Sequence, residues 1–159
     1  MKRVETVLAQ LMPDIAGKRV LEPACGCAEF SIAAAKYAQE VVCFDLDDKR
    51  MDPDVFRMSN LRFEIMDAAH MRYRDSSFDT VVLYNAIGHL SHMAEPVLRE
   101  CHRVAGERGI VCIVSSFRMD KAVIQETVLP LLVQMGLPFV TENYKDFEYV
   151  RIGRKTEHD

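Results

Sequence analysis

The chain alternates short apolar runs with stretches whose apolar residues recur every three or four positions. Val4–Leu11, for example, has apolar residues at 4, 7, 8 and 11, the spacing of one helix face. Predicted helices are Val4–Leu11, Ala28–Ala38, Pro53–Met58, Met93–Val104 and a last one beginning near Asp120. Predicted strands are Arg19–Glu22, Glu40–Asp45, Arg62–Met66, Phe78–Tyr84 and Gly109–Ser115. Strands that alternate with helices typically lie parallel in one sheet.

Turn and breaker residues complete this outline. Pro13 and Gly17 are expected to end the first helix, and Pro130 to kink the last one, because proline removes a donor and clashes with the preceding turn. Two further strands, Phe139–Tyr144 and Phe147–Lys155, flank the polar pair Lys145-Asp146, which predicts an antiparallel hairpin. The predicted class is therefore α/β, a three-layer α-β-α sandwich with a seven-stranded, mostly parallel sheet and a C-terminal antiparallel hairpin.

Composition fits one soluble domain over residues 1–159, without repeats or linkers. The net charge of −4 argues against a nucleic-acid partner, which normally meets a basic face. Glu5, Gln10 and Asp14 interrupt any apolar segment near the start, so we expect neither a signal peptide nor a membrane partner, and a cytoplasmic location. The five cysteines, an odd number, predict reduced thiols.

The segment after the first strand has the form of a nucleotide-site loop. Glu22 ends the strand, Gly26 lies in the turn, and a helix follows, whose N-terminus offers free N–H groups to a ligand. The dinucleotide pattern G-x-G-x-x-G is absent, because Gly26 is its only glycine. This speaks against a nucleotide-linked oxidoreductase, although that class stays open.

Acidic residues follow the next two strands. Asp45 closes the second strand, where a carboxylate can accept hydrogen bonds from both ribose hydroxyls, and Asp47 is a nearby competitor. Asp67 follows the third strand, where it could accept from an adenine amino group. Three acids at successive strand ends indicate an adenosine site more strongly than any one of them.

These segments together resemble the class I S-adenosylmethionine-dependent methyltransferases, specifically the methyltransferase type 11 group that contains the ubiquinone and menaquinone biosynthesis enzymes. The resemblance covers roughly residues 18 to 116 in unbroken order. The matching segments are Leu21–Ala28, Val42–Asp45, Met66–Ala69, Phe78–Leu90 and Arg99–Val104.

The resemblance implies S-adenosylmethionine as cofactor, S-adenosylhomocysteine as product, and a role for each matched residue. Glu22, Ala24 and Gly26 would frame the methionine end of the cofactor. Asp45 would hold the ribose, with Leu46 packing on adenine. Asp67 and Ala68 would read the adenine edge, and Asn85 would lie beside the methionine moiety.

The chain also departs from the family pattern. Ala24 and Ala28 replace the first and third glycines of the loop motif, which we expect to be tolerated where the backbone φ is negative. Tyr84-Asn85-Ala86-Ile87 stands in place of the Asp/Asn-Pro-Pro-Tyr signature of amino-methylating nucleic-acid enzymes, so that class is disfavoured.

No residue is singled out as the catalyst, and Tyr84 and His89 are weak candidates. We expect no metal site. Cys25, Cys27 and Cys43 could be close in space, but they lack a paired C-x-x-C spacing, and free cysteine is a common small buried residue. His89, His92 and Glu95 could align on one helix face, but a loop histidine that packs or caps is the favoured interpretation.

The predicted reaction is direct displacement of a methyl group onto a small-molecule acceptor, with alignment of the reactants as the main contribution of the protein. A non-catalytic cofactor- or partner-binding module on the same fold is the alternative. Only about eighteen residues precede the first strand, so we expect a minimal substrate cover and an open pocket, completed by a homodimer partner or another subunit.

Overall fold

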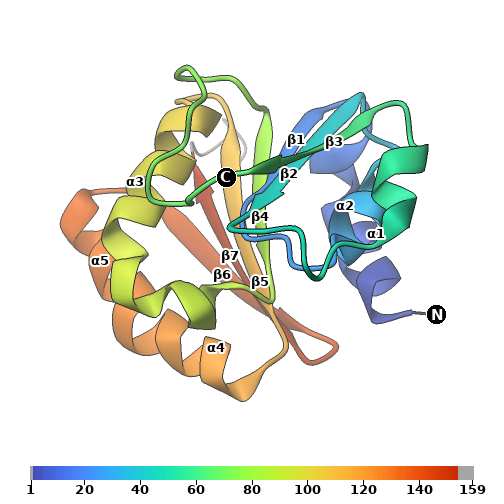
Figure 1. Ribbon diagram of the computed structural model, residues 1–159. Coiled ribbons are helices and arrows are strands. Elements are labelled where there is room, and N and C mark those ends of the chain that lie inside the picture. Colours follow the sequence, from blue (N-terminus) through green and yellow to red (C-terminus); the bar gives the residue numbers. More distant parts are fainter. Residues whose placement is uncertain (1, 154–159) are drawn as a thin grey trace.

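Seven strands form one sheet in a computed structural model that describes residues 2–153 (Figure 1). The strands are β1 (Arg19–Glu22), β2 (Glu40–Asp45), β3 (Leu61–Ile65), β4 (Thr80–Tyr84), β5 (Ile110–Ser115), β6 (Phe139–Tyr144) and β7 (Phe147–Gly153). The α-helices are α1 (Arg3–Ile15), α2 (Glu29–Ala34), α3 (Ala94–Ala105), α4 (Arg118–Val123) and α5 (Leu129–Met135). Two 3₁₀ segments, η1 (Pro53–Arg57) and η2 (Ile87–Met93), and a π segment, η3 (Ile124–Val128), complete the structure.

The sheet order is β3-β2-β1-β4-β5-β7-β6, which confirms the predicted architecture. The first five strands are parallel, and β7 pairs antiparallel with both β5 and β6. Because β1 pairs with β2 on one side and β4 on the other, the strand order reverses between β1 and β4. Ligands of open α/β sheets bind beyond the carboxyl ends of the strands at such a switch point.

Two apolar cores lie on the two faces of the sheet, because alternate residues of each strand point to opposite sides. Val20, Val41 and Val82 belong to the core that α1 and α2 cover. Leu21, Val42 and Val81 belong to the core beneath α3, η3 and α5. Figure 1 shows the same division, with α1 and α2 on one side of the sheet and α3, α4 and α5 on the other.

Several element boundaries differ from the prediction. Helix α1 continues past Pro13 to Ile15, so the prediction that Pro13 ends it was wrong, and the helix stops within one turn of that proline. Helix α2 ends at Ala34, short of the predicted Ala38. The chain before α3 is the 3₁₀ segment η2, and only the part from Ala94 onward is α-helical.

The last helix changes its hydrogen-bonding pattern next to Pro130, where the sequence predicted a kink. The π segment η3 ends two residues before it, and Pro130 lies in the first turn of α5. A π segment rearranges the backbone hydrogen bonds in the turn where proline cannot donate one.

The β6–β7 hairpin turns at Lys145 and Asp146, whose φ values of 47° and 69° are both positive. Two left-handed residues are the requirement of a type I′ turn, which matches the twist of the flanking strands. The predicted end of the second strand, Lys155, lies outside the described residues. Among residues 2–153, none of the helices combines the length and apolar character that crossing a membrane requires.

Candidate active site

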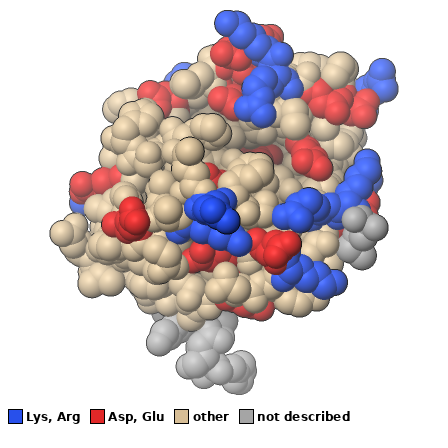
Figure 2. Space-filling view, turned by 90° about the horizontal axis from the view of Figure 1, so that it is seen from below, with Lys and Arg blue, Asp and Glu red and all other residues tan. Residues whose placement is uncertain are grey.

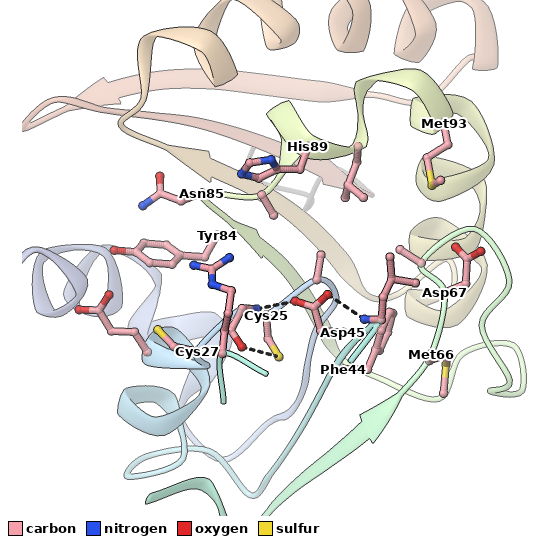
Figure 3. Close-up of a pocket in the computed structure, with 18 of the residues that line it drawn as sticks. Cys25, Cys27, Phe44, Asp45, Met66, Asp67, Tyr84, Asn85, His89 and Met93 are labelled. Carbon is pink, nitrogen blue, oxygen red and sulfur yellow. Dashed lines mark hydrogen bonds between the residues drawn. The ribbon is translucent and has the colours of Figure 1, made fainter. Parts of the chain in front are cut away.

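A cavity of about 420 Å³ opens at the carboxyl ends of β1, β2 and β4 (Figure 3). Nine of the ten candidate residues line it: Ala24, Gly26, Asp45, Leu46, Asp67, Ala68, Tyr84, Asn85 and His89. In the view of Figure 3, Tyr84, Asn85 and His89 lie on one side of the cavity, and Asp67 and Met66 on the other. The structure therefore brings together side chains that follow β1, β2, β3 and β4.

Glu22 is the candidate that does not line the cavity. Its side chain is 1% exposed, and its Oε1 accepts hydrogen bonds from Ser31 Oγ at 2.6 Å and from Ser31 N at 3.1 Å. Burial raises the pKa of the Glu22 carboxyl well above its usual value, and the bonds from Ser31 oppose that rise. Glu22 thus joins β1 to α2 beneath the loop instead of facing a ligand.

Asp45 fixes the loop between β1 and α2. Its Oδ2 accepts a hydrogen bond from Gly26 N at 2.7 Å, and its Oδ1 accepts one from Leu46 N at 2.8 Å. The competitor, Asp47, accepts from Lys49 N and does not line the cavity. Asp45 is therefore the acid at the end of β2 that faces the site.

The two loop alanines have positive φ, 52° at Ala24 and 67° at Ala28. The condition under which we expected alanine to be tolerated, a negative φ, is therefore not met, because the loop keeps the left-handed turns that glycines usually make. Alanine in this conformation is destabilised by roughly 1–2 kcal/mol relative to its right-handed one. The loop accordingly holds backbone strain at both positions.

Asp67 faces the cavity from the segment after β3. Its Oδ1 accepts a hydrogen bond from Ala69 N at 2.8 Å, so one carboxylate oxygen caps its own turn. Buried Met66 and Ala68 flank it, and Leu46, which is 69% exposed, lines the same cavity. A carboxylate among apolar side chains suits a flat aromatic base with amino groups at its edge.

Asn85 follows β4 with a φ of 50°. Its Oδ1 accepts a hydrogen bond from Ser116 N at 3.0 Å and lies 3.1 Å from Ser115 Oγ, whose proton the Asp120 carboxylate accepts. Because Ser116 N can only donate, the amide orientation is fixed, and the Asn85 NH₂ group remains available as a donor at the cavity.

Asp120 is a buried residue of this region that the sequence reasoning missed. It is 3% exposed, its Oδ1 accepts from Gly88 N at 3.1 Å, and its Oδ2 bonds Ser115 Oγ. A Cβ on Gly88 would lie 2.1 Å from Asp120 Oδ1, so glycine is required there. This contact fixes η2, which carries His89 and His92, against the start of α4.

Tyr84 stacks between Phe30 and Phe147, with ring centroids 5.8 Å and 6.3 Å apart. Burial raises the pKa of its hydroxyl to about 12, and the neighbouring carboxylates of Glu29 and Glu22 add to the rise. At neutral pH the hydroxyl therefore stays protonated and serves as a hydrogen-bond donor at the cavity, not as a base.

His89 and His92 both line the cavity, whereas Glu95 bonds Arg99 at 2.8 Å and does not line it. Cys25 and Cys43 are buried and Cys27 is exposed, and all five cysteines are free thiols. Across residues 2–153, no cluster of three or more His, Cys, Asp or Glu side chains is arranged to hold a metal ion.

The cavity fits an adenosyl ligand by the chemistry of its lining. The Asp45 and Asp67 carboxylates accept hydrogen bonds from hydroxyl and amino groups, and Leu46, Phe44 and Met66 supply apolar surface. Arg50, Glu29, Met93 and Phe117 also line it and were not among the site residues predicted from the sequence.

Comparison with known proteins agrees with this reading. Residues 21–113 match the family described as "Methyltransferase domain". A demethylmenaquinone methyltransferase of Lactobacillus johnsonii is 31% identical over 119 residues, which are 69% of this chain and 48% of the relative. A probable S-adenosylmethionine-dependent methyltransferase of Mycobacterium tuberculosis is 31% identical over 120 residues, 74% of this chain and 43% of the relative. The chain thus spans less than half the length of these relatives.

A solved structure shares the fold. A methyltransferase from Aquifex aeolicus, described as dependent on S-adenosylmethionine, superposes with a TM-score of 0.77 at 16% identity, over 94% of this chain and 88% of that one. Together with the family match, these findings show that the chain belongs to the class I S-adenosylmethionine-dependent methyltransferases, an enzyme family whose cofactor is S-adenosylmethionine.

Proposed function

We propose that this chain transfers a methyl group from S-adenosylmethionine to a small-molecule acceptor by direct displacement. The observation that carries the proposal is the cavity itself, in which Gly26, Asp45 and Asp67 meet Tyr84 and Asn85 at one sheet edge. When bound, S-adenosylmethionine supplies an electrophilic methyl group. The products are S-adenosylhomocysteine and the methylated acceptor, and an acceptor that enters as a neutral O–H, N–H or S–H group also releases one proton.

The chain's own residues would hold the cofactor by three kinds of contact. Asp45 would accept from the ribose hydroxyls and Asp67 from the adenine amino group. Leu46 would cover the base with its exposed side chain, which loses water-exposed apolar surface on binding. The fixed loop around Gly26 sets where the methionine end begins.

The acceptor would enter beside Tyr84, Asn85 and His89. The Tyr84 hydroxyl and the Asn85 amide are donors that orient it, and His89, exposed at the cavity, is the side chain in this group that can take up a proton. Alignment of two reactants accounts for as much as about 7–11 kcal/mol of the barrier, so the chemistry does not require a stronger base.

Charge on the face around the cavity supports a small acceptor. Figure 2 shows the molecule from the side at which β5 leads into α4, and side chains of both signs are spread over this face without one sign prevailing. A nucleic-acid acceptor would favour a continuous basic surface.

A non-catalytic module is the second candidate, and the positive φ at Ala24 and Ala28 is the observation that favours it. A chain that had lost selection for turnover would keep the fold while its cofactor loop accumulated strain. The two functions differ in one measurable way, which is whether bound S-adenosylmethionine is converted to S-adenosylhomocysteine.

The test has two stages. Isothermal titration calorimetry of the wild-type chain with S-adenosylmethionine and S-adenosylhomocysteine measures binding, and the absence of heat at millimolar ligand would contradict the methyltransferase and favour a partner-binding module. Methyl-labelled cofactor is then offered with thiol, phenol, amine and quinone acceptors. Transfer of label to one class supports the methyltransferase, whereas binding without transfer to any class supports the module.

A further inference from the structure

Arg50 lies over the cofactor loop in an unusual way for an exposed arginine. Its Cζ, Nη1 and Nη2 atoms are each 3.5 Å from the position that a Cβ on Gly26 would take. Because the three atoms are equidistant, the flat face of the guanidinium lies against the loop at Gly26. The N–H groups, which lie in the guanidinium plane, therefore point sideways and remain open to the cavity that Arg50 lines.

The guanidinium has no carboxylate partner of its own. Within residues 2–153, no acidic oxygen lies within 4.0 Å of it. The Asp45 carboxylate accepts backbone N–H bonds from Gly26 and from Leu46 and forms no ion pair with Arg50. A positive charge thus faces a ligand cavity with its donors unpaired.

Of the charged groups of S-adenosylmethionine, one can form an ion pair with the Arg50 guanidinium. S-adenosylmethionine carries a sulfonium, an ammonium and a single anionic group, the carboxylate of its methionine part. A guanidinium repels the first two groups and pairs with the third through two parallel N–H···O bonds. The Asp45 carboxylate, which bonds Gly26 N, suits the ribose hydroxyls, and the Arg50 guanidinium over the same loop suits the carboxylate.

We propose that Arg50 binds the carboxylate of the cofactor over the loop at Gly26. The inference rests on the family's cofactor and adds a residue that the loop motif does not contain. An anionic group on the acceptor is the other source of the same chemistry, and the experiment separates the two.

The experiment compares two ligands that differ in this carboxylate. S-adenosylhomocysteine has the amino-acid part, and 5′-methylthioadenosine lacks it. Calorimetry measures the affinity of both ligands for the wild type, for Arg50→Gln and Arg50→Lys, and for the matched control Arg57→Gln. Arg57 is an exposed arginine that pairs with Asp54 and does not line the cavity. Thermal unfolding of each variant verifies that it folds.

The expected result is that Arg50→Gln weakens S-adenosylhomocysteine binding by roughly ten- to a hundred-fold, the range for losing a charge-assisted hydrogen bond. Binding of 5′-methylthioadenosine should change by less than about two-fold, since the lost contact is absent from that ligand. Arg50→Lys should retain part of the preference for S-adenosylhomocysteine over 5′-methylthioadenosine, because lysine keeps the positive charge but lacks the planar fork of N–H donors. Arg57→Gln should leave both affinities unchanged.

Three outcomes would overturn the proposal. Equal weakening of both ligands would mean that Arg50 merely supports the loop. No change for either ligand, with a weakened affinity for an acidic acceptor, would assign the guanidinium to the acceptor. No change in any affinity would leave it as a solvated surface charge. A wild type that binds neither ligand would instead contradict the proposed function, so the two failures are distinguishable.

Discussion

The carboxylate of Asp45 accepts a hydrogen bond from the backbone N–H of Gly26 at 2.7 Å, which ties the end of β2 to the loop after β1. The same side chain lines the cavity, so it supports the loop and faces the ligand at once. Its loss should therefore have two effects on cofactor binding, one through the ribose contact and one through the position of the loop.

Asp45→Ala is expected to weaken S-adenosylhomocysteine binding by about a hundred-fold or more, since a charge-assisted bond and a loop support disappear together. Asp47→Ala is the matched control, because Asp47 belongs to the same acidic segment but does not line the cavity. Calorimetry of both variants measures the difference. A larger loss for Asp47→Ala would show that the ribose contact has been assigned to the wrong acid.

Ala24→Gly should relieve the positive φ of 52°. Glycine adopts this conformation without strain, which raises the free energy of unfolding. Glycine also increases the conformational entropy of the unfolded chain, and this lowers the free energy of unfolding by about 0.4–1 kcal/mol. Ala16→Gly is the control, because exposed Ala16 has an ordinary φ of −62°. Glycine at this position relieves no strain and only increases the conformational entropy of the unfolded chain.

The free energy of unfolding should be higher for Ala24→Gly than for Ala16→Gly by about 1 kcal/mol or more. Urea unfolding of the two variants measures this difference. Equal free energies would mean that the loop holds no strain at Ala24.

Gly88 and Asp120 should show strong coupling in a double-mutant cycle. Gly88→Ala places a Cβ 2.1 Å from Asp120 Oδ1 and should destabilise the chain by about 1–3 kcal/mol. Asp120→Ala leaves Gly88 N without its buried partner, which costs about 1–3 kcal/mol.

In the double variant the clash between the Cβ and Asp120 Oδ1 is absent. The loss of unfolding free energy in the double variant should therefore be smaller than the sum of the losses in the two single variants, by about 1 kcal/mol or more. Chemical unfolding of the four proteins gives this coupling energy. Strict additivity would show that the two groups do not touch.

The buried Glu22 carboxyl should make stability depend on pH. Its pKa in the folded chain lies well above the unfolded value near 4.5, so at pH above that value the folded state keeps a proton that the unfolded state releases. This contribution to stability is full below the unfolded pKa and is lost as pH rises through the folded one.

Glu22→Gln cannot ionise and still accepts from Ser31. Its stability relative to the wild type should therefore increase between pH 5 and 8, by at most about 1.4 kcal/mol per pH unit. Urea unfolding across this pH range measures the difference between the two proteins. A difference in unfolding free energy that does not change with pH would contradict a raised pKa for buried Glu22.

The sequence predicted the seven-stranded, mostly parallel sheet with its C-terminal hairpin, and most of the cavity residues, because both depend on regular geometry. The ends of parallel strands meet at one edge, so Asp45 and Asp67 had to lie near Gly26. The direction of the Glu22 side chain also follows from regular strand geometry, because residues 20 and 22 lie on the same face of β1 and this face packs against α2. We nevertheless predicted Glu22 as a cofactor ligand, because it belongs to the segment that resembles the loop motif.

Other features depend on how loops close and could not be read from spacing. Arg50 reaches the site from an irregular segment, where the path of the backbone determines the direction of the side chain, and Asp120 reaches Gly88 because of how α4 packs against η2. The φ values of Ala24 and Ala28 follow from the loop's closure onto Phe44 O and Asp45, not from the preference of alanine.

The position of β7 has a consequence for how the chain is made. The last strand in chain order lies inside the sheet, between β5 and β6, and all six residues of β5 pair with it. During synthesis, the parallel strands can assemble first, but the outer hydrogen-bonding edge of β5 stays open until Phe147–Gly153 leaves the ribosome. A growing chain exposes this apolar edge to other chains for that interval, so chaperone demand and aggregation should be governed by the arrival of seven residues, none of which lines the cavity.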